Sequence, residues 1–421
     1  MTEDPNPSAR LSEHPTPPCD PASPSSGGSS SPSFAAHLPI IFTSRTTINV
    51  AHRIIYPFLP SLARGLGITL AAASRLVTLR TVGGMVAPVL GLLADRYGRR
   101  RVMEAALVLF VLAGLLMVGV GTLPAALVAF TLYGLAKALY DPAVHAYVGD
   151  RVPYQERGRA IGIIELTWSS AWLLGVPASG FLIERVGWRA PWAVLVALGL
   201  LGLGLTHAVL PPARPAAVQR RAGSALASML ATWRRLLRHR SVLALLATSF
   251  LLTQAVEIPF IVYGAWIETA FGLSLSTLGL ASTAVGLAEA AAEFGTTVIT
   301  DRLGKKRSVL AGLLGLAASL IVLPWLSRLG LVAALVSVAL LLLNFEFGIV
   351  SLMPVATELA PDSRASLVAL NVTAMSTSRA LAALVGGWLW QWESIALNAG
   401  VGAACAIVGV AIVVWGMQDV G

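Results

Sequence analysis

The chain has few charged residues and almost no cysteine. Only 12% of its 421 residues are charged, whereas 56% are hydrophobic and the mean hydropathy is +0.75. A soluble domain of this length does not need so much apolar surface, so the composition predicts an integral membrane protein. Its only two cysteines, Cys19 and Cys405, lie in a polar stretch and an apolar run, which excludes a disulfide framework and a cysteine metal site within the chain.

Enzymatic and nucleic-acid-binding motifs are also missing. The sequence contains no phosphate-binding glycine loop that ends in Lys-Ser or Lys-Thr, no nucleophile elbow and no metal-ligand spacing. We therefore expect no enzyme activity, no cofactor, no metal and no ATP-driven step. The net charge of +9 comes from short basic clusters between apolar runs rather than from one basic face, so no nucleic-acid partner is expected.

The apolar runs predict an all-α membrane protein with twelve transmembrane helices. From about residue 39 onward, runs of about 20 residues recur, and each is long enough to cross about 30 Å of hydrocarbon. The predicted organisation has four parts: a disordered Pro/Ser-rich tail (residues 1–38), a six-helix bundle (39–210), a basic linker (211–241) and a second six-helix bundle (242–418). Within the linker, residues 224–237 could form a basic amphipathic helix on an anionic membrane surface, or could simply be solvated.

An internal repeat indicates that the two bundles are pseudo-symmetric. Residues 91–101 read GLLADRYGRRR, and residues 297–307 read TVITDRLGKKR. At an offset of 206 residues, four positions correspond: Asp95 with Asp301, Arg96 with Arg302, Gly98 with Gly304, and Arg99 with Lys305. Repeated membrane halves are typical of secondary transporters.

The first of these loops resembles a motif of the major facilitator superfamily, which has the form G-x-L-a-D-r-x-G-r-r/k-r/k. Eight residues fill the pattern: Gly91, Leu93, Asp95, Arg96, Gly98, Arg99, Arg100 and Arg101. The resemblance runs from about residue 39 to the carboxyl end. It implies two bundles that rock about a central site, but it implies no particular substrate.

Two further segments relate the chain to the antiporter branch of that superfamily, which includes drug exporters. Residues 175–180 (GVPASG) partly resemble the glycine and proline motif of the fifth helix in that branch. The branch also carries an arginine four residues before a glycine in the fourth helix. When that glycine is aligned with Gly134, Phe130 stands at the place of the arginine, and Lys137 is a possible substitute. Proton coupling is therefore expected to depend on acidic residues of the second bundle.

The repeated loops have a physical interpretation as gates. Asp95 ends the second predicted helix and should lie near the start of the eleventh, where unpaired N–H groups favour an anion, while Asp301 should face the start of the fifth. Arg96, Arg99 or Arg100 could reach Asp150. The two glycines of the loops suit a tight turn with positive φ. The basic residues could alternatively serve only as topology anchors, which would not explain the repeated aspartate.

The distribution of lysine and arginine predicts the orientation. Nineteen of these residues lie in the linker and in the loops near Asp95, Asp150, Asp301 and Asp362, but only five lie in the opposite loops. Such an asymmetry places the tail, the linker and the carboxyl end in the cytoplasm of a cell with the protein in its inner or plasma membrane. A monomer in the lipid bilayer is the expected form.

Charged residues within the predicted spans point to the transport pathway. Burying a charge in a membrane costs at least about 2.5 kcal/mol, so such residues tend to mark pathways or relays. Glu289 and Glu293 are one turn apart, at about 18 Å and 12 Å from the cytoplasmic end of their helix. Two carboxylates this close disfavour joint ionisation, so the pair could carry a proton. The remaining candidates are Arg80, Arg53, Glu257, Arg379, Glu346 and Trp172.

Some of these charges could instead form static ion pairs. Lys137 and Asp141 are spaced to neutralise each other on one helix face. Arg379 is an expected counter-ion for a nearby glutamate. Trp168 and Trp172 share a helix face and could stack on a substrate, although tryptophan in a bundle more often packs.

The sequence therefore predicts a secondary active transporter of alternating access, which exports a small amphiphilic or drug-like molecule in exchange for protons. Three alternatives stay open. One is uptake or facilitated diffusion of a sugar or an organic anion, in which Arg53 and Arg80 would bind the anionic group. Another is a transporter-like membrane receptor or scaffold, although a static scaffold would not need two repeated gating loops. The third is movement of a lipid between the leaflets, which the sequence does not distinguish from drug export.

Overall fold

The computed structural model describes residues 34–211 and 222–417, and this part of the chain is helical with no β-strand. The first helix begins at Phe34, whereas the sequence placed the end of a disordered tail at residue 38. Pro39 lies inside this helix, in its second turn, and its side chain is exposed. The rest of the predicted tail, residues 1–33, lies outside the described residues.

The first half of the chain contains six membrane-crossing segments, two of which are interrupted. In chain order they are α1 (Phe34–Arg53) continued by α2 (Ile55–Leu66), α3 (Leu70–Tyr97), α4 (Arg99–Gly119), α5 (Leu123–Arg151), α6 (Tyr154–Ser170) continued through η1 (Ala171–Gly175) into α7 (Val176–Arg185), and α8 (Ala190–Val209).

The second half repeats this order after a linker helix, α9 (Ala222–Leu236), which matches the amphipathic segment expected at residues 224–237. Its segments are α10 (Arg240–Phe260) with α11 (Tyr263–Phe271), α12 (Leu275–Ala281) with α13 (Thr283–Leu303), α14 (Lys305–Leu326), α15 (Leu331–Leu359), α16 (Arg364–Leu389) and α17 (Ile395–Gly416). Single 3-10 turns, η2 (Ser327–Leu329), η3 (Pro361–Ser363) and η4 (Trp390–Trp392), connect some of them.

Length and apolar composition alone identify most of these segments as membrane spans. Ten helices in the described residues qualify, or eleven when the pair α2 and α3, bent by 119°, is counted as one span. The remaining difference from the predicted twelve arises in the first two segments, which carry Arg45, Arg53 and Arg80. These three arginines are buried within the protein, so they lower the apolarity of the segments without facing lipid.

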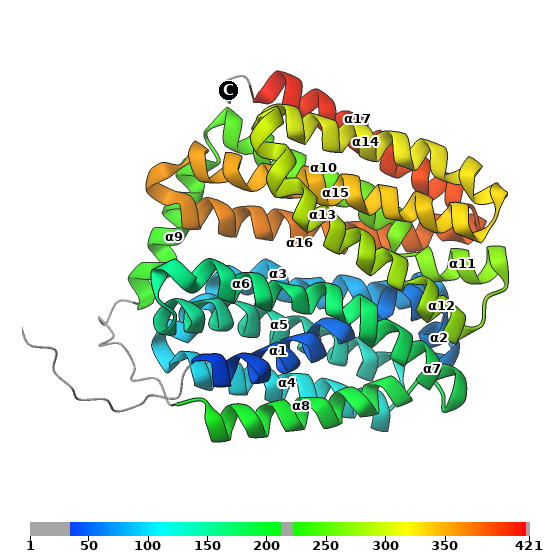
Figure 1. The fold of residues 1–421 in the computed structure, drawn as a ribbon, viewed down its shortest axis with the longest axis horizontal. Helices are drawn as coiled ribbons and strands as arrows, with labels where there is room; N and C mark the ends of the chain where they lie inside the picture. The colour runs from blue at the N-terminus through cyan, green and yellow to red at the C-terminus, as the bar shows by residue number, and fades with distance from the viewer. Residues whose placement is uncertain (1–33, 212–221, 418–421) are drawn as a thin grey trace, which may run out of the picture. The chain divides into compact units, whose positions relative to one another are not determined.

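The two halves form two groups of helices, one above the other in Figure 1. They contact each other mainly through three pairs of elements, α3 with α16, α7 with α12, and α2 with α11, and also where α13 packs against α6 and η1. The third and sixth spans of each half pack in the same way, as α4 with α8 and α14 with α17. The linker helix α9 contacts α16 and lies at one end of the bundle. The helices α3, α5 and α13 end on this side, and α6 and α16 begin on it. We call this the linker side.

Four of the segments are interrupted near their middle. The fifth segment contains the π-helical turn η1, in which the N–H of Val176 donates to the carbonyl of Ala171, five residues back. Pro177 follows directly and has no N–H of its own, so the wider turn accommodates it. The other interruptions lie at Ile54, at residues 261–262 and at Ser282. Irregular backbone at this depth is tolerated where it is buried in protein, and here it lies between the two halves.

Candidate functional site

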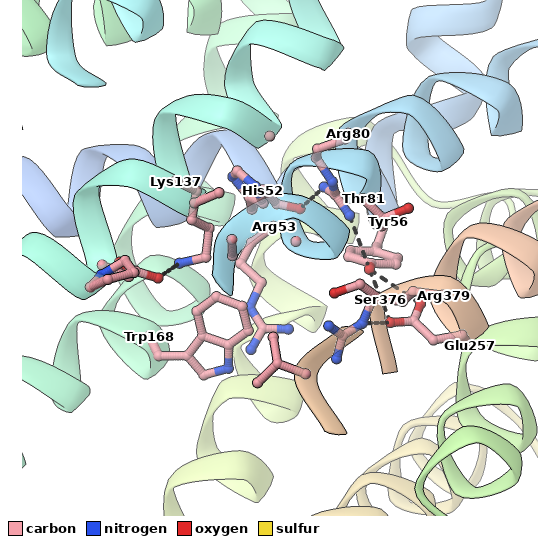
Figure 2. Close-up of a pocket in the computed structure, with 17 residues that line it drawn as sticks. His52, Arg53, Tyr56, Arg80, Thr81, Lys137, Trp168, Glu257, Ser376 and Arg379 are labelled. Atoms are coloured by element: carbon pink, nitrogen blue, oxygen red, sulfur yellow. Dashed lines mark hydrogen bonds and ion pairs between the residues drawn. The ribbon is translucent and has the colours of Figure 1, made fainter. Parts of the chain in front are cut away.

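A cavity of about 280 Å³ lies between the two halves (Figure 2). Residues of α1, α2, α3, α5 and α6 line it from the first half, and residues of α10 and α16 line it from the second. The lining begins near the middle of these helices. From there it extends toward the linker side, where Ala87, Asp141 and Val372 contribute.

The Tyr56 hydroxyl group connects charged residues of both halves. It accepts a hydrogen bond from Arg80 (3.1 Å) and donates to a carboxylate oxygen of Glu257 (3.2 Å). Glu257 in turn lies 2.5 Å from the guanidinium of Arg379. Figure 2 shows this row of side chains along one wall of the cavity. It joins α2 and α3 of the first half to α10 and α16 of the second, and it gives Arg379 the glutamate partner that the sequence led us to expect.

A second ion pair crosses between the halves beside the cavity. Arg53, at the end of α1, lies 2.7 Å from Glu289 of α13, and both side chains are buried. The Arg53 guanidinium also lies over the ring of Trp168, 3.7 Å from its centroid. Cations over an aromatic face are attracted by the ring quadrupole, so Trp168 helps to hold Arg53 in place. Trp168 itself lines the cavity.

The cavity wall formed by α5 carries a pair that is neutral overall. Lys137 lies 2.8 Å from Asp141, one turn later on the same helix, as their spacing predicted. Lys137 also donates to the side-chain oxygen of Asn49 (2.5 Å).

A polar cluster behind this wall was not found from the sequence. Arg45 of α1 is buried and lies 3.1 Å from both Asp141 and Glu165. It also donates to the Ile164 carbonyl (2.7 Å), while His145 lies 3.0 Å from Glu165. The sequence signal was present, since Arg45 lies eight residues before Arg53 and thus close to the same helix face. The sequence prediction placed Arg45 within the first bundle, residues 39–210, but did not include it among the charged candidates for the pathway.

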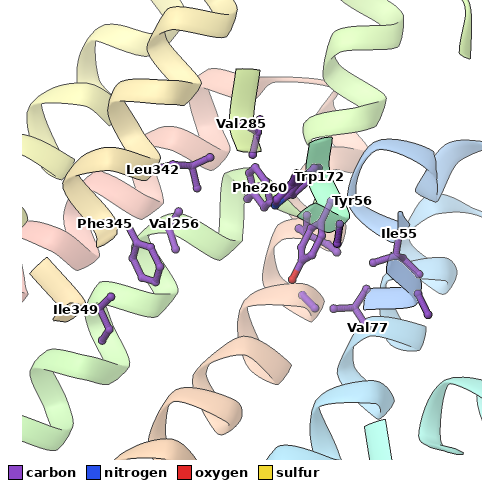
Figure 3. Packing of buried hydrophobic residues seen from close by; sticks show 14 of the residues in the cluster. Ile55, Tyr56, Val77, Trp172, Val256, Phe260, Val285, Leu342, Phe345 and Ile349 are labelled. Carbon is purple, nitrogen blue, oxygen red and sulfur yellow. The ribbon is translucent and has the colours of Figure 1, made fainter. Parts of the chain in front are cut away.

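Aromatic side chains fill the space between the halves next to the cavity (Figure 3). Phe260 of α10 lies within 6 Å of Tyr56, Trp172 and Tyr263, as measured between ring centroids (4.9, 5.9 and 5.6 Å). Trp172 is fully buried and does not line the cavity. Its position favours packing over the alternative of stacking on a substrate.

Beyond the aromatic cluster, on the side opposite the linker, the halves touch backbone to backbone. A side chain at Gly264 would collide with the backbone of Pro57, and one at Gly180 would collide with the carbonyl of Leu275. Polar contacts lie nearby: Arg64 pairs with Glu268 at 2.9 Å, and the Ser276 N–H donates to Glu184. The cavity is therefore closed on this side.

The geometry can be compared with known proteins. The family model described as Major Facilitator Superfamily matches residues 41–264 and 245–419, which together cover most of the chain. The chain belongs to the major facilitator superfamily of transporters. The resemblance found in its loops is thereby confirmed.

Relatives of this transporter include several bacterial proteins. It is 25% identical over 356 residues to an uncharacterized MFS-type transporter, YceJ, of Bacillus subtilis (strain 168), covering 84% of this chain and 88% of the relative. It is 26% identical over 295 residues to the tetracycline resistance protein, class C, of Escherichia coli (69% and 74%).

Solved structures show the same fold. A D-xylose-proton symporter has a TM-score of 0.72 at 17% identity (91% of this chain and 98% of that one). A peptide transporter POT in complex with sulfate has a TM-score of 0.75 at 15% identity (91% and 94%). The expected fold, with twelve transmembrane helices in two six-helix bundles, is confirmed.

The repeated loops of this major facilitator protein agree in backbone conformation. Gly98 has φ 90° and ψ 143°, and Gly304 has φ 81° and ψ 149°. Both conformations favour glycine, as expected for the tight turn. In the described residues, each loop also takes part in a cross-helix ion pair: Arg99 with Asp150 at 3.3 Å, and Lys305 with Glu358.

The side chains proposed to gate the transporter, Asp95, Arg96, Asp301 and Arg302, lie outside the described part. Their helices nevertheless pack as expected, since α3 contacts α16 and α13 contacts α6. The side chain of Glu293 also lies outside the described part, so the predicted carboxylate pair with Glu289 stays a prediction. Glu346, in α15, is absent from the described lining of the cavity.

Proposed function

We propose that this protein is a secondary active transporter that works by alternating access and exports a small amphiphilic molecule in exchange for protons. The observation that carries the proposal is the position of the cavity. It lies at the middle of both halves, and charged side chains of both line it, while the backbones of the halves meet at Gly264 and Gly180 on the side opposite the linker. Substrate sites of such transporters lie near the midplane, at the interface between the repeats.

Alternating access would exchange the closed and open sides. The contacts of α2 with α11 and of α7 with α12 would separate, and the halves would approach on the linker side instead. The repeated loops at Gly98 and Gly304 belong to that side, which fits a gating role for Asp95 and Asp301. The cavity described above then corresponds to the form accessible from the cytoplasm, if the linker is cytoplasmic as the basic loops predict.

The lining of the cavity supports an amphiphilic cargo. Small and apolar residues, among them Ala87, Ala138, Pro142 and Val372, alternate with charged ones. A volume of about 280 Å³ is close to the lower end of ordinary ligand sites, about 300–1,000 Å³. A small molecule with an apolar body and a polar or charged group fits these properties. The name of the E. coli relative, a tetracycline resistance protein, supports export of a drug-like molecule.

Glu257 and Glu289 are the described carboxylates that support proton coupling. Each bridges the two halves, Glu257 through Tyr56 and Glu289 through Arg53. Protonation of either one would weaken a contact between the halves, so proton binding and rocking would be linked. Glu293 and Glu346 could extend the same pathway. The alternative is that these carboxylates form static ion pairs and carry no proton. In that case the pH dependence of transport would not change when they are replaced.

A reconstituted transport assay tests this proposal. We expect proteoliposomes with an inward proton gradient to move tetracycline, chosen as the first probe, against its concentration gradient, and a protonophore to stop this. The variants Glu289→Gln and Glu293→Gln should flatten the pH dependence, whereas Glu393→Gln, on the exposed loop before α17, should not. Unchanged pH dependence in the first two variants would remove the proton role from these residues.

The same assay separates the alternatives. Uptake of a sugar or an organic anion would move the solute in the opposite direction, and facilitated diffusion would move it without the proton gradient. Of these two solute classes, the organic anion is the one that Arg80 supports. A receptor or scaffold would move none of the solutes tested. We further propose a monomer in the inner or plasma membrane, with the tail, the linker and the carboxyl end in the cytoplasm.

A further inference from the structure

Arg80 differs from the other lysine and arginine side chains that line the cavity. Each of those has a carboxylate oxygen close by: Arg53 at 2.7 Å from Glu289, Lys137 at 2.8 Å from Asp141, and Arg379 at 2.5 Å from Glu257. Among the side chains that the structure describes, Arg80 forms no ion pair. Its guanidinium donates to two neutral oxygens, the His52 carbonyl (2.5 Å) and the Tyr56 hydroxyl (3.1 Å).

The position of Arg80 makes this arrangement costly. The residue is 4% exposed and lies near the middle of α3, and its Nε has no hydrogen-bond partner in the described part of the protein. A charge at the centre of a membrane helix is costly even by insertion measurements. A charged ligand would offset this cost, because a buried guanidinium is stabilised strongly by a bidentate carboxylate or phosphate.

We propose that Arg80 binds an anionic group of the transported molecule, so that the cargo is an amphiphilic anion such as a carboxylate, sulfonate or phosphate ester. This inference rests on the proposed transport function and specifies its substrate class. The Nε and the two terminal nitrogens of Arg80 would face the anionic oxygens. The apolar body of the cargo would lie along α5 and α16, against Ala138, Pro142 and Val372.

Tyr56 would transmit the occupancy of this site to the contact between the halves. The anion would compete with the Tyr56 hydroxyl for the guanidinium of Arg80, and the same hydroxyl donates to Glu257 across the interface. Binding would therefore act on a hydrogen-bonded row that joins α2 and α3 to α10 and α16. No other described cation of the cavity is linked to both halves through a neutral side chain in this way.

Three probes that differ only in charge test the proposal: 4-phenylbutyrate, 4-phenylbutanol and 4-phenylbutylamine. Their binding to the full chain in lipid nanodiscs is measured by thermal shift and by calorimetry. We expect the carboxylate to bind more tightly than the alcohol and the amine. Arg80→Gln should weaken carboxylate binding by about tenfold or more, the loss expected for a charge-assisted hydrogen bond, and should leave the alcohol unaffected. Arg80→Lys should retain part of the preference.

The controls address folding and non-specific attraction. Arg328→Gln removes a cation from the loop between α14 and α15 and should leave binding of all three probes unchanged. Melting of each variant without ligand checks that Arg80→Gln is folded. Equal binding of the three probes, undiminished carboxylate binding in folded Arg80→Gln, or the absence of carboxylate binding at millimolar concentration would each overturn the proposal.

Transport in proteoliposomes distinguishes a failure of this site from a failure of the proposed function. Transport of amphiphiles without preference for an anion would contradict the role of Arg80 and leave the transporter intact. Selective binding of 4-phenylbutyrate at Arg80, with no transport of any solute, would support the site and contradict the transporter.

Discussion

Two buried carboxylates, Glu257 and Glu289, connect the halves beside the cavity, and each has an arginine partner. Such pairs add little net stability, because removing two charges from water costs about as much as their attraction returns. Breaking one by removing a single partner is expensive, however, because a bare charge stays buried. These contacts are therefore better suited to switching between two arrangements than to holding one of them.

A double-mutant cycle at Arg53 and Glu289 tests this interpretation. Glu289→Gln should lower the Tm of the purified protein, because it leaves Arg53 buried without a counter-ion, a change that costs about 3–5 kcal/mol in soluble proteins. The double variant Arg53→Met with Glu289→Leu should recover most of the loss. Thermal unfolding in nanodiscs measures both, and a double variant as unstable as the single one would contradict the prediction.

Gly264 is predicted to be needed for closure on the side opposite the linker. Gly264→Ala places a methyl group against the backbone of Pro57, so the halves can no longer approach there. We expect a severalfold lower transport rate, with ligand binding from the linker side retained. Gly400→Ala is the matched control, since no described atom outside its own helix turn lies within 4 Å of an added methyl group. Equal rates in the two variants would show that closure does not depend on this contact.

Among the helices, the interrupted ones carry part of the site, and the continuous helices α3, α5 and α16 carry the rest. The first, fifth, seventh and eighth segments break near their middle, at α1–α2, η1, α10–α11 and α12–α13. These segments hold Arg53, Trp168, Glu257 and Glu289, whereas continuous helices such as α4, α8, α14 and α17 pack behind them. An interruption redirects the outer part of a segment, so that α2 meets α11 and α7 meets α12 on the closed side.

Cross-linking of α2 to α11 should stop the transport cycle. In a background with Cys19→Ser and Cys405→Ser, the variant Arg64→Cys with Glu268→Cys replaces an ion pair of 2.9 Å by two thiols. A short bismaleimide should join them and abolish transport, because the closed side can no longer open. Arg64→Cys alone, treated in the same way, should keep transporting. Full activity of the cross-linked double variant would exclude separation of these two helices during the cycle.

The whole molecule combines two similar halves whose charges differ. The first half contributes mainly cations to the centre, Arg53, Arg80 and Lys137, and the second contributes Glu257 and Glu289 together with Arg379. Opposite charges on the two facing surfaces pair across the midplane. The basic loops on the linker side predict that this side faces the cytoplasm.

Labelling from the two sides of the membrane tests this orientation. In the cysteine-free background, a membrane-impermeant maleimide should label Arg328→Cys in intact cells but not Ser224→Cys in the linker. Inverted membrane vesicles should give the reverse. The opposite pattern would place the linker outside the cell, and the open side of the cavity with it.

The sequence by itself determined the class, the repeat and the spans, because these depend on local properties: apolar length, charge near helix ends and glycine in a turn. It also determined short-range contacts such as Lys137 with Asp141, which one helix turn dictates. The first helix includes residues 34–38 of the predicted tail, and Arg45 is tolerated in this segment because the bundle surrounds it.

Only the tertiary structure decided which charges meet across the interface. Arg53 and Glu289 are 236 positions apart, and Tyr56 and Glu257 are 201 apart, so no periodicity could pair them. Tyr56 carried no signal in the sequence, because a tyrosine in a span resembles ordinary packing until its hydroxyl is seen between Arg80 and Glu257. The sequence also did not show that Arg80 has no carboxylate partner among the described side chains. The neighbours of Arg80 come from other helices, and the packing of those helices determines which groups lie close to it.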